Sequence, residues 1–161
     1  MSGETKQQRV QDLWERGTQR LMEGRVAEAI DLYEKSIHIK PTAEAYTYRG
    51  WAVSFLGDLD AAIEDCKKAI RIDPDFGNPY NDIGVYLMQQ GRIDDAIPWF
   101  ENAKNAKRYE PRHFPYLNLG RVYLAKGQSM RALDEFVKAL EIRPEDDSAL
   151  EAIKKINYSV N

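Results

Sequence analysis

The chain contains few of the residues from which disulfides, metal sites and catalytic centres are built. Its 161 residues include one cysteine, Cys66, and two histidines, His38 and His113. A single cysteine excludes an internal disulfide, and neither histidine has Cys, Asp or Glu partners at metal-ligand spacing. The sequence also has no phosphate-binding glycine loop, no nucleophile elbow and no Ser/His/Asp set. We therefore expect a protein without enzymatic activity, with no metal and no cofactor.

Long apolar runs and an excess of positive charge are absent as well. No run of about 18 apolar residues occurs, so no segment is expected to span a membrane. The formal net charge of −3 argues against a nucleic-acid binder that works through a broadly basic surface. The N-terminal stretch MSGETKQQRVQDLW has no apolar signal-peptide segment, which makes the cytoplasm the expected location. The expected partner is therefore a protein or peptide rather than a nucleic acid or a membrane.

The sequence does contain a pattern of small, aromatic and proline residues that occurs four times. Successive first glycines lie 33, 34 and 36 residues apart (50−17, 84−50 and 120−84). A recurrence of this length indicates a repeat architecture. The four copies are Gly17, Gly24, Ala29, Tyr33, Ser36 and Pro41; Gly50, Gly57, Ala62, Cys66, Ala69 and Pro74; Gly84, Gly91, Ala96, Phe100 and Ala103; and Gly120, Gly127, Ala132, Phe136, Ala139 and Pro144.

Over roughly 10–144 the chain resembles the tetratricopeptide repeat (TPR) family. The resemblance implies an all-α fold, a right-handed superhelical array of antiparallel helix pairs (a TPR solenoid). We expect a flexible N-terminus at 1–9, a C-terminal capping helix and tail at 145–161, and between them four units at 10–42, 43–76, 77–112 and 113–144. The expected helices are 10–23, 26–39, 43–56, 59–72, 77–90, 93–106, 113–126, 129–142 and 147–157.

The repeated glycines have two different expected roles. The first glycine of each copy lies inside a helix, where glycine costs about 1 kcal/mol relative to alanine, so a close approach between helices is expected there. The second ends its helix, where a residue able to take positive φ is favoured. Cys66 stands where the other copies have an aromatic residue, and it is expected to be a buried, inert thiol.

The family resemblance also places a binding groove. In relatives, the first helices of the pairs line a concave face that commonly binds extended or helical peptides. The corresponding residues have an aromatic N-terminal half and a polar C-terminal half, and aromatic anchors dominate interface energies. Alternatively, the aromatic residues pack on neighbouring helices and complete the core. The candidate groove residues are Trp14, Thr18, Tyr48, Trp51, Phe55, Asn81, Asp82, Phe114, Asn118 and Arg121.

The junction between the third and fourth units is two residues longer than the others and is rich in basic residues. It is either a solvated turn or a basic contact patch for an acidic segment or a phosphate group. A similar extended step occurs in the TPR lipoproteins that assist bacterial pilus assembly, which makes an assembly factor of that kind one alternative function. The basic residues are Lys104, Lys107, Arg108 and Arg112, beside Tyr109 and His113.

The leading hypothesis is a non-enzymatic protein-protein interaction module or scaffold that binds a peptide or helix in its concave groove. A rival hypothesis is a self-associating structural unit whose exposed aromatic residues close a homo-oligomer interface; the expected state is a monomer or weak homodimer. The carboxylate clamp of co-chaperone relatives is not expected, because the matching positions do not supply its paired cations.

Overall fold

The computed structural model describes residues 3–159, and within these residues all regular elements are helical. The prediction of an all-α fold is thus confirmed. The parts of the expected N-terminal segment and C-terminal tail at 1–2 and 160–161 lie outside the described residues. The helices are α1 (Lys6–Met22), α2 (Val26–Ile39), α3 (Ala43–Phe55), α4 (Leu59–Ile72), α5 (Asn78–Gln89), α6 (Ile93–Asn105), α7 (Phe114–Ala125), α8 (Ser129–Ile142) and α9 (Asp147–Ser159).

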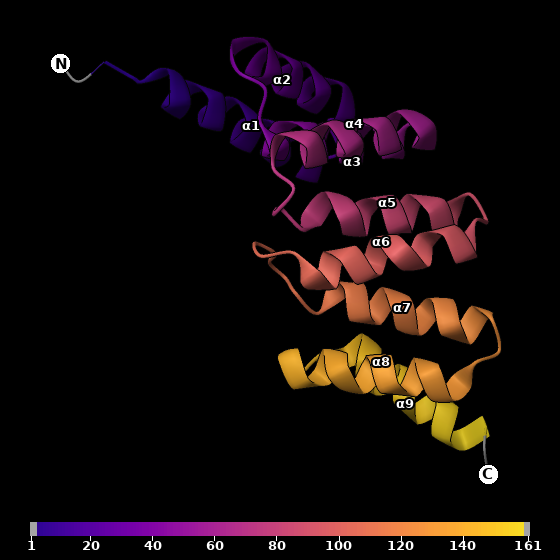
Figure 1. The fold of residues 1–161 in the computed structure, drawn as a ribbon. Coiled ribbons are helices and arrows are strands. Elements are labelled where there is room, and N and C mark those ends of the chain that lie inside the picture. The colour runs from indigo at the N-terminus through magenta and orange to yellow at the C-terminus, as the bar shows by residue number, and fades with distance from the viewer. Residues whose placement is uncertain (1–2, 160–161) are drawn as a thin grey trace.

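Consecutive helices form pairs, and the pairs stack into one column. In Figure 1 the column runs from α1 and α2 at the top to α8 and α9 at the bottom, with the two termini at opposite ends. Each of α1 to α6 packs on its partner in the pair and on the first helix of the next pair, as α4 does on α5, and α8 packs on α7 and on the unpaired α9. The fold is thus built from contacts between neighbours in sequence, as expected for a solenoid.

The expected helix boundaries agree with the structure within two residues at every end but one. Helix α1 begins at Lys6, four residues before the expected start (10−6). A capping box explains the difference, because Thr5 Oγ1 accepts from Gln8 N at 3.1 Å and Gln8 Oε1 accepts from Thr5 N at 2.8 Å. The expectation of a flexible N-terminus over 1–9 is therefore wrong for the residues from Thr5 onward.

The mid-helix glycines lie where helices of a pair approach closely. A Cβ atom at Gly84 would lie 2.5 Å from Cε1 of Phe100, whose side chain is fully buried. At Gly50 the facing side chain is the smaller Cys66, also fully buried, and a Cβ would lie 3.5 Å from its Sγ. The expected close approach and the expected burial of Cys66 are both confirmed. The turn glycines take positive φ as expected, at Gly24, Gly57, Gly91 and Gly127.

The longer junction between α6 and α7 packs against the preceding junction, between α4 and α5. Arg108 N donates to Asp75 O at 2.9 Å, and Gly77 N donates to Arg108 O at 2.8 Å. Tyr109 is buried beside Gly77, where a Cβ would lie 2.6 Å from the tyrosine Cβ. The junction is therefore a packed connection between two inter-unit turns, and the solvated-turn interpretation is wrong at Tyr109.

Candidate functional site

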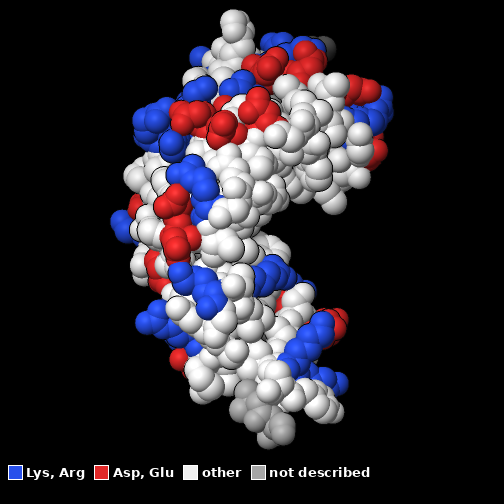
Figure 2. Space-filling model, turned by 90° about the vertical axis from the view of Figure 1, so that its right-hand side faces the viewer, with Lys and Arg blue, Asp and Glu red and all other residues white. Residues whose placement is uncertain are grey.

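The first helices of the pairs form the inner wall of a curved molecule. Figure 2 shows the stack bending around a hollow that opens to the right, with an upper wall of largely uncharged residues. Helices α1, α3, α5 and α7 contact one another in succession, whereas α2, α4, α6 and α8 have no comparable contacts among themselves. Helices that lie closer together occupy the inside of a curve, so the concave face belongs to α1, α3, α5 and α7.

An aromatic cluster covers the N-terminal half of this face. The rings of Trp14 on α1 and Tyr48 on α3 stack with centroids 5.4 Å apart, and Tyr48 in turn lies 6.4 Å from the buried Tyr33. Trp51 and Phe55 form a second pair at 5.8 Å. Trp14, Tyr48 and Trp51 are half-buried, while Phe55 is 61% exposed. The aromatic residues therefore help to complete the core and still present area to a partner.

Thr18 serves the packing of this cluster. Its hydroxyl donates to Trp14 O at 3.0 Å, and Thr18 Oγ1 lies 3.1 Å from Tyr33 Oη. Because the hydroxyl is used by the backbone of its own helix and by a buried tyrosine, it positions the aromatic residues around it. Sequence reasoning placed Thr18 among the groove residues but did not foresee this link.

In the C-terminal half, the polar candidates are joined to one another. Asn118 Nδ2 on α7 donates to Asn81 Oδ1 on α5 at 2.9 Å, and Arg121 Nη1 donates to Asn118 Oδ1 at 2.9 Å. Both asparagine side chains are buried, so much of their hydrogen-bonding capacity holds α5 to α7. Phe114, at 41% exposure, lies at the start of α7 and packs its ring on His113.

Asp82 lies on α5, between these two halves. Its side chain is half-buried. Burial raises the pKa of its carboxyl to about 7, while the neighbouring Asn81 amide favours the charged form. The same carboxylate contributes to the raised pKa of Tyr48, which connects it electrostatically to the aromatic half.

The basic residues of the long junction are held by other groups of the protein. Lys104 has a side chain only 10% exposed and pairs with Glu135 at 2.8 Å, and Arg108 pairs with Asp73 at 2.6 Å. Arg112 donates to the backbone carbonyls of Lys104 and Lys107 at the end of α6. Lys107 pairs with Asp75 at 3.5 Å, yet its side chain remains 81% exposed. The four cations therefore mainly connect repeat units, and we leave them out of the proposed site.

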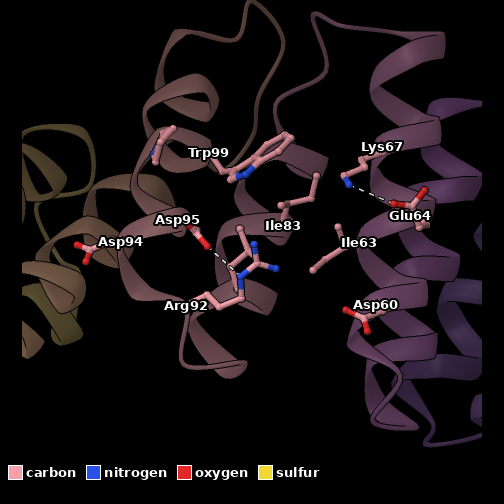
Figure 3. A pocket seen from close by; sticks show the side chains of 11 residues that line it. Asp60, Ile63, Glu64, Lys67, Ile83, Arg92, Asp94, Asp95 and Trp99 are labelled. Carbon is pink, nitrogen blue, oxygen red and sulfur yellow. Dashed lines mark hydrogen bonds and ion pairs between the residues drawn. The ribbon is translucent and has the colours of Figure 1, made fainter.

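A cavity of about 500 Å³ opens on the outer side of the molecule, between α4 and α6 with α5 as its floor (Figure 3). Ile63, Ile83 and Trp99 form part of its apolar wall. Its charged groups already have partners, since the pairs drawn in Figure 3 are Arg92 with Asp95 and Lys67 with Glu64. Asp60 and Asp94 are likewise bonded, to Gln90 and Lys126 respectively. This cavity is the gap expected between second helices on the convex side of a curved stack.

The described residues contain no group of three or more His, Cys, Asp or Glu side chains that could hold a metal ion. In the same part of the chain, none of the helices combines the length and the apolar character that a membrane crossing needs. The cytoplasm stays the predicted compartment.

Comparison with known families and proteins supports the repeat interpretation. Tetratricopeptide repeat family models match residues 43–76 and 75–145, which together make up 103 of the 161 residues (145−42). Small glutamine-rich tetratricopeptide repeat-containing protein 2 of Mycosarcoma maydis is 38% identical over 74 residues, 45% of this chain and 21% of that protein. Human mitochondrial import receptor subunit TOM70 is 32% identical over 84 residues, 51% of this chain and 14% of the receptor. The chain thus spans less than a quarter of the length of each of these two relatives.

Solved structures of similar fold cover more of the chain. Pseudomonas aeruginosa PilF has a TM-score of 0.90 at 22% identity, over 96% of this chain and 70% of that one. PilW, a type IV pilus biogenesis factor, has a TM-score of 0.83 at 19% identity, over 93% of this chain and 69% of its own. MamA has a TM-score of 0.71 at 27% identity, over 84% of this chain and 79% of its own. At these identities the likeness to PilF and PilW shows the solenoid fold alone.

Proposed function

The chain belongs to the tetratricopeptide repeat family, and from that premise we propose that it is a non-enzymatic binding module whose concave face holds a peptide or helix of a partner protein. The observation that supports this most directly is the aromatic cluster of Trp14, Tyr48, Trp51 and Phe55. These large side chains lie on inner helices of a curved stack, and Phe55 is 61% exposed.

The physical reason is the energy available from covering such side chains. Burying a large apolar side chain contributes about 1.5–3 kcal/mol, and interface energy concentrates in a few aromatic anchors. The rings of Trp14 and Tyr48 are held in place by stacking on each other and by contact with Tyr33, so little conformational entropy is lost when a partner covers them.

A double variant tests the proposal. Trp14→Ala with Trp51→Ala should keep its helical circular dichroism and lose the partners that the wild-type protein captures from an extract of its source organism. Trp99→Ala is a matched control, because Trp99 is a half-buried tryptophan beside the cavity on the convex side. If the folded double variant captures the same partners as the wild type, the aromatic groove is not the binding site.

Self-association is a second candidate function, and it is favoured by exposed apolar side chains at one edge of the first two units. Met22, Phe55 and Leu56 are 73%, 61% and 65% exposed and lie at the ends of α1 and α3. Light scattering over a range of protein concentrations separates the two functions. Self-association would be favoured if the average molar mass of the wild type rises with protein concentration and the mass of Phe55→Ser is lower at the same concentration. A constant monomer mass would exclude self-association.

A role in pilus assembly is a further candidate, because PilW is a type IV pilus biogenesis factor. Its support is the likeness in fold to PilW and to PilF, which extends over 93% and 96% of this chain respectively. Co-purification of pilus components with the wild-type protein is the test, and their absence from the captured partners would remove this candidate.

A further inference from the structure

Asp82 differs from the other carboxylates of the protein that are shielded from water. Among the described residues, every other aspartate or glutamate that is at least half-buried, except Asp146, forms an ion pair with a lysine or arginine, and Asp146 accepts a hydrogen bond from Ala149 N at 2.9 Å at the start of α9. The cations are Arg108 for Glu44 and Asp73, Arg49 for Asp65, and Lys104 for Glu101 and Glu135. Asp82 has no such cation in the part of the chain that the structure describes.

The groups around Asp82 offer no compensating charge. Its carboxylate contributes to the raised pKa of Tyr48 on α3, Cys66 on α4, Tyr86 on α5 and Tyr109 after α6, and all four are neutral at pH 7. The charged side chains that act on the same groups are engaged elsewhere, since Arg108 pairs with Glu44 and Asp73, and Asp65 pairs with Arg49. On α7, which contacts α5, Arg121 donates to Asn118.

An unpaired carboxylate in such a setting is unfavourable, because removing a charge from water costs free energy that only a partner charge or strong hydrogen bonds return. The position of Asp82 shows where a partner charge could come from. It lies on the inner helix α5, next to Asn81 and in electrostatic contact with Tyr48, and hence at the boundary between the aromatic and the polar halves of the concave face.

We propose that Asp82 recognises a lysine or arginine side chain in the segment that occupies the concave face, next to an apolar side chain that the aromatic cluster holds. The proposal rests on the proposed binding function and adds the chemistry of the partner. Lysine and arginine suit the place because their apolar stems can lie along the rings of Trp14 and Tyr48 while the charged end reaches the carboxylate.

A peptide selection tests the proposal without knowledge of the natural partner. The probe is a random 12-residue peptide library displayed on phage, selected separately on wild-type protein and on Asp82→Asn, which keeps the side-chain size and removes the charge. Wild-type protein should enrich peptides with Lys or Arg at one fixed distance from an apolar residue. Asp82→Asn should keep the apolar preference and lose the basic one.

A thermodynamic cycle then isolates the pair. In a selected peptide, replacing the fixed Lys by norleucine, or Arg by citrulline, should weaken binding to wild-type protein at least roughly tenfold and binding to Asp82→Asn less than about twofold. An equal loss with both proteins would overturn the proposal while leaving the binding function intact. If the wild type selects peptides with no fixed basic position, the proposal about Asp82 fails. If the wild type selects no peptide, both the proposal about Asp82 and the proposed binding function fail.

The pairing also has a signature in pH. Because unpaired Asp82 has a pKa of about 7, binding of the basic peptide should strengthen roughly five- to tenfold between pH 6 and pH 8, as the carboxyl loses its proton. The same pH series with Asp82→Asn is the control. Because both proteins contain His38 and His113, the contributions of these histidines cancel when the two pH profiles are compared. Parallel pH profiles for the two proteins would contradict the pairing.

Discussion

Arg49 on α3 holds Asp65 on α4 through two hydrogen bonds, from Nε at 2.8 Å and from Nη2 at 2.7 Å. The Asp65 side chain is 7% exposed, and the guanidinium also lies 5.3 Å from the centroid of the Tyr46 ring. The parallel two-bond geometry is the strongest that arginine and a carboxylate form, so this pair fixes the second unit internally.

Breaking this pair should destabilise the protein more than breaking an exposed one. Asp65→Asn is expected to lower the free energy of unfolding by about 2–4 kcal/mol, because a shielded guanidinium loses its counter-charge. Asp31→Asn, which breaks the exposed pair with Lys35, should change it by less than about 1 kcal/mol. Urea unfolding at pH 7 measures both, and equal effects would contradict the distinction.

The mid-helix glycines should differ in their tolerance of alanine. Gly84→Ala is expected to lower the free energy of unfolding by about 1–3 kcal/mol, because the new Cβ would lie 2.5 Å from the buried Phe100 ring. This overlap outweighs the gain of about 1 kcal/mol in helix propensity. At Gly50 the shortest contact is 3.0 Å, to Ala62 O, so Gly50→Ala should lie much closer to neutral. Thermal unfolding of the two variants compares them directly, and the reverse order would be inconsistent with the packing described.

The Asn81–Asn118 bond should show coupling across the α5–α7 step. Either Asn81→Ala or Asn118→Ala is expected to lower the free energy of unfolding by about 1–3 kcal/mol, because the remaining amide is left with an unsatisfied buried atom. The double variant should lower it by less than the sum of the two single effects, since with both amides removed neither is left unpaired by the loss of the other; the loss of the Arg121 bond to Asn118 is common to Asn118→Ala and the double variant. Additive costs would mean that the bond contributes nothing specific.

The raised pKa of Asp82 should appear in the pH dependence of stability. In the folded protein the Asp82 carboxyl keeps its proton up to about pH 7, whereas in the unfolded chain an aspartate loses its proton near pH 4. The contribution of this protonation to the free energy of unfolding is therefore complete below about pH 4 and is lost as the pH rises to about 7. Asp82→Asn should therefore gain stability relative to the wild type over this window, on the order of 1–3 kcal/mol, and gain no more above it.

The quantity to measure is the difference in the free energy of unfolding between Asp82→Asn and the wild type. Urea unfolding at intervals from pH 4 to pH 8 gives this difference. Other titrating groups are common to both proteins and largely cancel. A difference that does not vary with pH would show that Asp82 titrates normally in the folded state.

Sequence reasoning was most successful where the determining interactions are local. Helix positions follow from glycine and apolar periodicity, and their expected ends agree with the structure within two residues except at α1. At α1 the signal is local as well, since Thr5 followed three residues later by Gln8 forms a capping box. The need for small residues at Gly84 and Gly50 could likewise be inferred from their recurrence at a fixed period.

For the candidate site, the family resemblance predicted which helices face inward but not what their side chains do. The sequence could not show that Asn81 and Asn118 bond to each other, or that Lys104 and Arg108 of the long junction pair with carboxylates. Nor did it single out Asp82, because a carboxylate without a cation is recognised only once all neighbours are known.

The sequence by itself determined an all-helical repeat array, because each unit carries its own turns and small residues, and an aromatic residue or Cys66 facing them, within about 34 residues. Only the tertiary structure decided which charges and amides meet, as with Lys104 and Glu135, which lie 31 residues apart, and Asn81 and Asn118, which lie 37 apart. The physical reason is that such pairs join different units. Their contact therefore depends on how successive units stack, a geometry that the packing of whole helices sets and that no local pattern encodes.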